Sequence, residues 1–321
     1  MNSDKQIWYI CSLIFISFSC TGQNSSENTG EVMIVNGFEI EEPTVPIDEI
    51  RVGTATRDAI PSIDDPDFIS ASDADFMSSD DKVIGLKINE EVRAYPMKIL
   101  TWHEIVNDRV EGKPVVISYC PLCRSAYVFS RLIDGEPVNF GVSGLLYNSN
   151  VVMYDRDTES LWSQIKGEAI NGPKKGTELE VIDATSTTWE DWTKEHPTTR
   201  VLSKKTGYDR NYERSPYGDY SENRDLMFPV GETSERFHPK ALIGGIEING
   251  KHKAYPIPVL EKMDKTTFSD RFQEVTLKIN FDPLAKEVEI TTSEGEKINV
   301  SHLYWFAWYA FHPETEVLKE D

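Results

Sequence analysis

The sequence predicts an α+β fold that is rich in β-structure, with two pseudo-repeated lobes in which short helices pack on antiparallel sheets. Hydrophobic residues make up 39% of the 321 residues, which is enough to bury one large core or two ordinary ones. Apolar and polar residues alternate in short runs bounded by turn residues, as they do in β-strands. One such run returns later in the chain, and this repeat predicts two lobes of related fold.

The N-terminal region has the features of a targeting segment. Lys5 precedes an apolar run, residues 7–18, that is too short to span a bilayer, and a small residue and Cys20 follow it. This arrangement resembles a bacterial lipoprotein signal over residues 1–20, with Cys20 as the lipidated residue; an ordinary secretory signal is the alternative. Residues 21–46 are polar and predict a flexible tether. We therefore expect an extracytoplasmic protein, in the periplasm or at the cell surface, anchored to the membrane through Cys20.

The first lobe begins with a hairpin and a helix. Two alternating runs flank Asn89, which predicts a turn between strands, and Pro96 is favoured in the first turn of a helix. The predicted elements are strands at 83–88 and 92–95, a helix at 97–107, and strands at 115–119 and 125–131.

The repeat sets the boundaries of the lobes. The run that ends in Ala94-Tyr-Pro returns at Ala254-Tyr-Pro, 160 positions later. A Trp-x-x-Trp-x-x-x-His-Pro segment that begins at Trp189 returns at Trp305, 116 positions later. The difference gives the first copy 44 residues that the second lacks. We expect a first lobe at residues 47–202, a connector at 203–240 and a second, reduced lobe at 241–321.

The net charge of −21 limits the classes of partner. An acidic chain is repelled by nucleic acid and by anionic membrane surfaces, so neither is expected to bind it. The partner that we expect, apart from the membrane through a lipid anchor, is a small molecule or a protein thiol.

Features that only the first copy has are the candidates for function. Cys120 and Cys123 are the only cysteines outside the leader, and His103 lies upstream of them. The offset of 160, continued without a gap, pairs these candidates with residues of other chemistry: Cys120 with Asn280, Cys123 with Pro283, and His103 with Met263.

Two cysteines this close, in an oxidising compartment, form a disulfide, bind a metal or cycle between redox states. A bridge over two residues closes almost no loop and stabilises the fold little. The run after Cys123 alternates as a strand rather than a helix, so a thioredoxin-like fold is not expected. We predict a thiol-redox pair, Cys120 and Cys123, with His103 as a proton carrier or thiolate partner.

Two alternatives use the same residues. Structural zinc prefers four N or S ligands, and the chain has no second cysteine pair. Copper(I) is better suited to a soft set made of Cys120, Cys123, His103 and Met153, so a copper-binding module is the first alternative. The second is a partner-binding protein whose site has decayed.

The additional segment of the first copy predicts a pocket wall. Residues 141–164 carry more donors, acceptors and aromatic faces than a plain hairpin requires. The predicted pocket residues are Ser143, Tyr147, Asn148, Asn150, Asp155, Trp162 and Gln164.

Several motifs together resemble the bacterial and archaeal domain-of-unknown-function family 3179, over about residues 56–318. The motifs are Ala94-Tyr-Pro96, Cys120-Pro-Leu-Cys123, the segment 141–150, Met153-Tyr-Asp155 and Leu161-Trp-Ser-Gln164. The resemblance implies an exported or lipid-anchored protein. Some members are selenoproteins with selenocysteine in the Cys-x-x-Cys region, which implies redox or nucleophilic work for Cys120 and Cys123.

Overall fold

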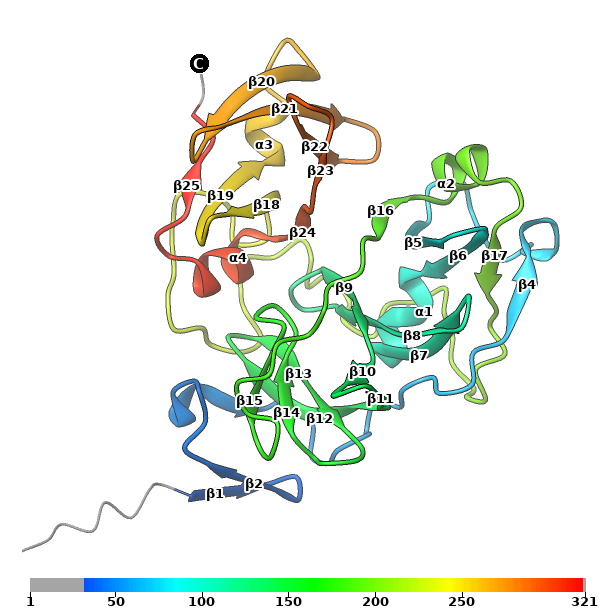
Figure 1. Cartoon of the computed structure of the whole chain (residues 1–321), viewed down its shortest axis with the longest axis vertical. Helices are drawn as coiled ribbons and strands as arrows, with labels where there is room; N and C mark the ends of the chain where they lie inside the picture. The colour runs from blue at the N-terminus through cyan, green and yellow to red at the C-terminus, as the bar shows by residue number, and fades with distance from the viewer. Residues whose placement is uncertain (1–31, 320–321) are drawn as a thin grey trace, which may run out of the picture. The chain divides into compact units, whose positions relative to one another are not determined.

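A computed structural model describes residues 32–319, and the expected signal, Cys11, Cys20 and residues 21–31 lie outside this range. The described chain is rich in β-structure, as expected, and its four α-helices are short (Figure 1). The larger sheets have three to five strands, and no thioredoxin-like βαβ arrangement occurs in residues 32–319. No helix in this range is long and apolar enough to cross a membrane.

The helices are α1 (Met97–His103), α2 (Trp189–Glu195), α3 (Ile257–Leu260) and α4 (Trp305–Phe311), with 3-10 turns at Ile47–Glu49 and Ala71–Asp73. The strands up to the end of the first copy are β1 (Val32–Val35), β2 (Phe38–Glu41), β3 (Ile50–Val52), β4 (Phe68–Ser70), β5 (Lys82–Ile88), β6 (Glu91–Pro96), β7 (Ile105–Val110), β8 (Lys113–Cys120), β9 (Ser125–Ser130), β10 (Leu132–Ile133), β11 (Glu136–Pro137), β12 (Phe140–Tyr147), β13 (Asn150–Asp155), β14 (Leu161–Ser163), β15 (Glu168–Asn171), β16 (Thr185–Thr188) and β17 (Arg200–Leu202). The remaining strands are β18 (Leu242–Ile248), β19 (Lys251–Pro256), β20 (Thr267–Phe272), β21 (Val275–Asp282), β22 (Glu287–Thr292), β23 (Lys297–Ile298), β24 (Ser301–Tyr304) and β25 (Glu316–Val317).

Two sheets have the same plan. One has the order β16-β5-β6-β17-β4, and the other has the order β24-β18-β19-β25. Thr185 pairs with Gly85 in the first, as Ser301 pairs with Gly245 in the second. Each sheet also contains one parallel pair, β6 with β17 and β19 with β25, so the sheets are not purely antiparallel.

The same side chain covers the equivalent glycine in both sheets. A Cβ atom on Gly85 would lie 2.4 Å from Cζ3 of Trp192, and one on Gly245 would lie 2.4 Å from Cζ3 of Trp308. Glycine is therefore required at both positions, because the helix after β16 or β24 packs its indole directly on the strand backbone.

The strand pairing corrects the offset between the copies. Ile105 pairs with Ser118 in the first copy, and Thr267 pairs with Asn280 in the second, so these hairpins are related by 162 positions. The two additional residues lie between α3 and β20. Cys120 therefore corresponds to Asp282 and Cys123 to Ala285, and the expected pairing with Asn280 and Pro283 is wrong.

The helix after Pro96 is shorter than predicted. It ends at His103, because Glu104 has a φ of +57° and turns the chain into β7. Residues 105–107, expected as helix, are the start of a buried strand whose β-branched side chains pack in the core.

The prediction of a flexible tether over residues 21–46 is wrong for residues 32–41, which the structure describes. Residues 32–41 form the hairpin β1–β2, in which Phe38 and Ile40 are buried with Val152 and Leu161. This short hairpin was not predicted from the sequence, because most of the residues around Phe38 and Ile40 are polar.

The additional residues of the first copy form most of one sheet, with the order β15-β14-β13-β12-β3. Connector residues 203–240 contain no helix or strand, yet Tyr212 and Tyr220 are buried in the cores that they contact.

Candidate functional site

The two cysteines flank a tight turn. Cys120 ends β8 and pairs with Ser125 at the start of β9, so four residues connect the strands. Arg124 closes the turn with a φ of +52°. Both thiols are free and fully buried, and both lie near the carbonyl oxygen of Ser149, at 3.3 Å for Cys123 and 3.9 Å for Cys120.

The equivalent turn of the second copy shows what its backbone favours. Oδ1 of Asp282 accepts hydrogen bonds from the N–H groups of Leu284 and Ala285, at 2.8 and 3.0 Å. In the first copy the N–H groups of Leu122 and Cys123 donate hydrogen bonds to the sulfur of Cys120 in the same way. The turn therefore presents two donors, which bind a carboxylate in the second copy and would stabilise the Cys120 sulfur as an anion in the first.

The two thiols differ in acidity. Burial raises the pKa of Cys120, but hydrogen bonds from the Cys123 thiol and from backbone N–H groups, including that of Val151, outweigh it and lower this pKa below the ordinary value. Burial, the hydrogen bond to Cys120 and the negative charge of Cys120 raise the pKa of Cys123 well above its ordinary value. Cys120 is thus the more acidic of the two thiols.

A buried carboxyl group that the sequence analysis missed lies beside this pair. Glu104 follows α1, and burial together with the nearby charge of Cys120 raises its pKa to about 8. The hydroxyl group of Tyr217 donates to Oε1 of Glu104 at 3.3 Å. The signal in the sequence was a carboxylate directly before the apolar strand that begins at Ile105.

The connector supplies aromatic residues to the same site. Burial and the charges of Glu104 and Cys120 raise the pKa of Tyr217, and burial and the charges of both cysteines raise that of Tyr220. The ammonium group of Lys240 lies 3.7 Å from the ring centroid of Tyr220. The connector therefore packs tyrosines against the core that contains both cysteines.

Two of the predicted pocket residues join a polar network next to the cysteines. The amide of Asn150 donates to Oε1 of Gln164 at 2.8 Å and to Oγ of Ser125 at 3.1 Å. A hydrogen bond with Asn150 acts in the opposite direction to burial and lowers the pKa of the Cys123 thiol, although the net shift is upward. Nε2 of Gln164 donates to Oγ of Ser118 at 3.0 Å, so the network is tied to β8.

Three other predicted residues have partners within their own sheet. Oγ of Ser143 accepts from the N–H of Leu145 at the bulge in β12. The carboxylate of Asp155 accepts from the indole N–H of Trp162 at 2.9 Å and also from Thr158. These contacts shape the strands and turns of the additional sheet.

Tyr147 and Asn148 lie at the end of β12, toward the second copy. The ring of Tyr147 packs edge-on against Phe311, with centroids 5.3 Å apart. Asn148 donates to the carbonyl oxygen of Ala310 and accepts from the N–H of Gly231.

His103 does not lie where the redox hypothesis placed it. Its Nδ1 is 2.8 Å from the carbonyl oxygen of Pro61, and its Nε2 is 2.8 Å from the hydroxyl group of Tyr212. Both ring nitrogens therefore have partners other than the cysteines, and burial lowers the pKa of His103. The neighbouring Glu104 takes the place beside Cys120.

The copper ligand set does not fit this geometry. Within residues 32–319, no three His, Cys, Asp or Glu side chains lie close enough together to hold a metal ion. His103 would have to leave Pro61 and Tyr212 to join the cysteines. Met153, the fourth donor of the set, is fully buried in the apolar core that also contains both cysteines.

Together, the fold and the site define a β-rich protein with a buried Cys-x-x-Cys pair on a scaffold unlike thioredoxin. The chain belongs to the family described as "Protein of unknown function (DUF3179)", whose model matches residues 57–283. The motif resemblance found in the sequence is thereby confirmed. No curated protein and no solved structure matches the chain.

Proposed function

We propose that the protein is an extracytoplasmic thiol-redox protein in which Cys120 is the nucleophile and Cys123 the resolving thiol. The observation that carries the proposal is the turn after β8, which offers the Cys120 sulfur the N–H donors that hold a carboxylate in the second copy. Stabilised thiolates are the reactive form of cysteine in disulfide exchange. The proposal extends to a lipid anchor at Cys20 and to a duplicated lobe whose second copy serves the fold alone.

Glu104 completes the proposed chemistry as a proton carrier. The Cys120 thiolate attacks one sulfur of a substrate disulfide, the substrate S–S bond breaks, and the departing thiolate takes the proton of the Glu104 carboxyl group. Cys123 then gives its proton to the Glu104 carboxylate and attacks the Cys120 sulfur. This second step releases the other substrate thiolate, which takes a proton from water, and leaves a Cys120–Cys123 disulfide. A dithiol donor reduces this disulfide and closes the cycle.

The burial of both sulfurs limits how the proposed reaction begins. Tyr217 and Tyr220 belong to a connector that has no helix or strand, and such segments open at low cost in free energy. Displacement of the connector would admit a substrate to Cys120 without disturbing the sheets below it.

A redox titration tests this function. The purified protein is equilibrated with dithiol buffers of stepped potential, and its thiols are counted by mass spectrometry. We expect one reversible two-electron transition that interconverts two thiols and one disulfide, and we expect Cys123→Ser to accumulate a mixed disulfide at Cys120. Thiols that stay reduced at every potential, in protein that folds normally, would contradict the proposal.

The same burial favours one competing function, a partner-binding protein whose cysteines are inert. In that case Cys120→Ser leaves binding to the partner and the cellular phenotype unchanged, and the redox titration shows no transition. The two functions therefore differ in one experiment.

A further inference from the structure

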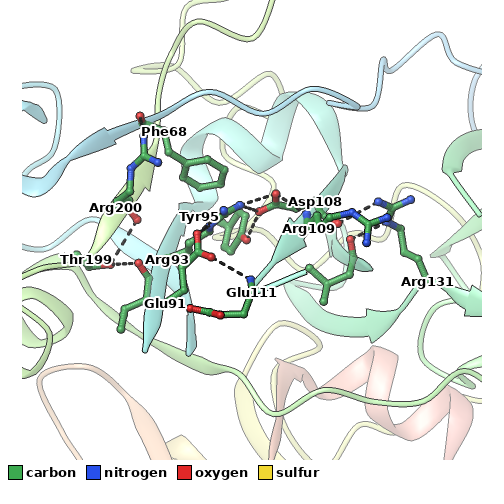
Figure 2. A network of polar contacts seen from close by, with 12 residues as sticks. Phe68, Glu91, Arg93, Tyr95, Asp108, Arg109, Glu111, Arg131, Thr199 and Arg200 are labelled. Carbon is green, nitrogen blue, oxygen red and sulfur yellow. Dashed lines mark hydrogen bonds and ion pairs between the residues drawn. The ribbon is translucent and has the colours of Figure 1, made fainter. Parts of the chain in front are cut away.

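Four arginines line one groove of the first copy. The groove has a volume of about 420 Å³ and is open to solvent. Figure 2 shows the side chains in order, from Arg200 beside Phe68, through Arg93 and Arg109, to Arg131. They come from β17, β6, β7 and the residue after β9, so the fold brings distant parts of the chain to one place. This clustering is unexpected in a chain with a net charge of −21.

One of the four is neutralised by carboxylates. Arg93 forms ion pairs with Asp108 and Glu91, and Tyr95 donates to Asp108 at 2.6 Å. The guanidinium group of Arg93 also lies 4.4 Å from the ring centroid of Phe68. Arg93 is therefore a structural cation within a closed network.

The guanidinium groups of the other three arginines donate only to neutral oxygens. Nη1 of Arg109 donates to the carbonyl oxygen of Gly112 at 2.6 Å, and Nη2 of Arg200 donates to that of Phe68. Arg131, which is only 7% exposed, donates to neutral oxygens as well. Its acceptors are the carbonyl oxygens of Val115, Val138 and Asp108, and Oδ1 of Asn139. Within residues 32–319, no carboxylate lies at ion-pair distance from any of the three.

The acidic residues of the groove mostly have other partners. Oδ1 of Asp64 accepts from Ser62 and Asn107, and Oδ2 of Asp67 accepts from Ser203. Asp108 is held by Arg93, and Asp65 is exposed at the rim. The charges of Asp108 and Asp64 still act on Arg131. In residues 32–319, however, no groove carboxylate contacts the guanidinium group of Arg109, Arg131 or Arg200 directly, so direct contact with these three groups is left for a ligand.

The second copy separates what the fold needs from what it does not. Lys253 pairs with Asp270, to which Tyr255 also donates, so the contacts of Arg93 and Tyr95 with Asp108 have a counterpart. The N–H of Ser293 donates to Thr276 as that of Arg131 donates to Pro114, which places Ser293 at the position of Arg131.

Arg200 is also replaced in the second copy. It pairs with Arg93 across the sheet, and Glu316 pairs with Lys253 in the same register. The two additional cations of the groove are therefore confined to the first copy, as the cysteines are.

We propose that this groove binds a small oxyanion, namely a phosphate, sulfate or carboxylate group, between Arg109, Arg131 and Arg200. Guanidinium groups present planar pairs of N–H donors that match the oxygens of these anions. Burial of Arg131 strengthens the attraction, because a charge shielded from water keeps more of its field. The site is independent of the thiol pair, and the failure of either proposal leaves the other standing.

The test is isothermal titration calorimetry of the purified protein with inorganic phosphate, sulfate or acetate at constant ionic strength. We expect saturable binding of at least one of these anions, and the preferred anion identifies the ligand group. Arg200→Glu and Arg109→Gln should each weaken it by at least tenfold. The matched control is Arg271→Gln, because Arg271 occupies the position of Arg109 in the second copy and pairs with the exposed Glu274.

Thermal unfolding of each variant checks that it folds. If Arg200→Glu does not fold, Arg109→Gln alone decides the test. Unchanged binding in Arg271→Gln supports the site. An absence of saturable binding to all three anions, or an equal loss in Arg271→Gln, would overturn the proposal.

Discussion

Two turns of the molecule share a geometry but differ in their residues. One connects β8 to β9, and the other connects β21 to β22. Each connects paired strands through four residues, and each ends in a basic residue with positive φ, which is Arg124 in the first and Lys286 in the second. The second turn is mostly exposed and holds Asp282, whereas the first holds the fully buried Cys120 and Cys123. The fold thus makes this turn without cysteines, and a carboxylate is sufficient to cap it.

The difference supports the proposal that the cysteines are present for their chemistry. A disulfide over two residues would stabilise the chain little, and the second copy shows that the turn needs no such bridge. The first turn is also surrounded by groups that the second lacks, including Glu104 and the tyrosines of the connector.

The largest effect is expected from removing the nucleophile. Cys120→Ser should slow exchange with a model disulfide by at least about a hundredfold, because a hydroxyl group is not ionised at neutral pH. Asp282→Ser, the same change of capping group in the second copy, should leave the rate unaltered. The rate of thiol release from the model disulfide measures both, and equal rates in the two variants would contradict the assignment.

The glycines under the two tryptophans test whether the copies are equivalent as folds. Gly85→Ala and Gly245→Ala should each destabilise the protein by about 1–3 kcal/mol, because the new methyl group overlaps the indole of Trp192 or Trp308. Denaturant unfolding measures both free energies. A variant that is as stable as the parent would show that its sheet relaxes and that the copies differ.

Glu104 predicts a pH dependence that belongs to the first copy. Its pKa of about 8 in the folded protein lies above the ordinary carboxyl value, so the folded state keeps a proton that the unfolded state has lost. The contribution to stability is full below the ordinary pKa and is lost as the pH rises toward 8, by on the order of 1 kcal/mol per pH unit. Glu104→Gln should flatten the stability profile between pH 5 and pH 8. A profile with the parent's slope would place the titrating group elsewhere.

The smallest effect is expected at His103. His103→Asn should leave disulfide exchange unchanged, because both ring nitrogens are bonded to Pro61 and Tyr212 rather than to the thiols. The rate of exchange at constant pH decides this, with thermal unfolding as the control for folding. A large loss of rate in a stable variant would restore His103 as the proton carrier.

The sequence was sufficient to predict the β-rich class, the hairpin over residues 83–95 and its repeat 160 positions later, because alternation and turn residues act locally. It misplaced the second half of the repeat by two residues, because an insertion before β20 leaves no apolar signal. It predicted a longer helix because nothing in the residue type of Glu104 requires a positive φ.

The candidate site was predicted in part for a similar reason. Cys120 and Cys123 are rare residues at a short spacing, so the sequence alone marks them. Glu104 and Tyr217 reach the site from separate elements, and only the fold brings such residues together. Ser143 and Asp155 were predicted as pocket residues. The sequence did not indicate that Ser143 stabilises the bulge in β12 or that Asp155 stabilises the turn after β13.

In the proposed function, the turn after β8 makes Cys120, and not Cys123, the reactive thiol. The most direct measurement is alkylation of the fully reduced protein with a small reagent over a range of pH, with mass spectrometry reporting the modified residue. We predict that Cys120 is modified first, with a midpoint below the ordinary thiol pKa, and that Cys123 follows only well above that value. Modification of both cysteines together at the ordinary pKa, or of Cys123 first, would contradict the account.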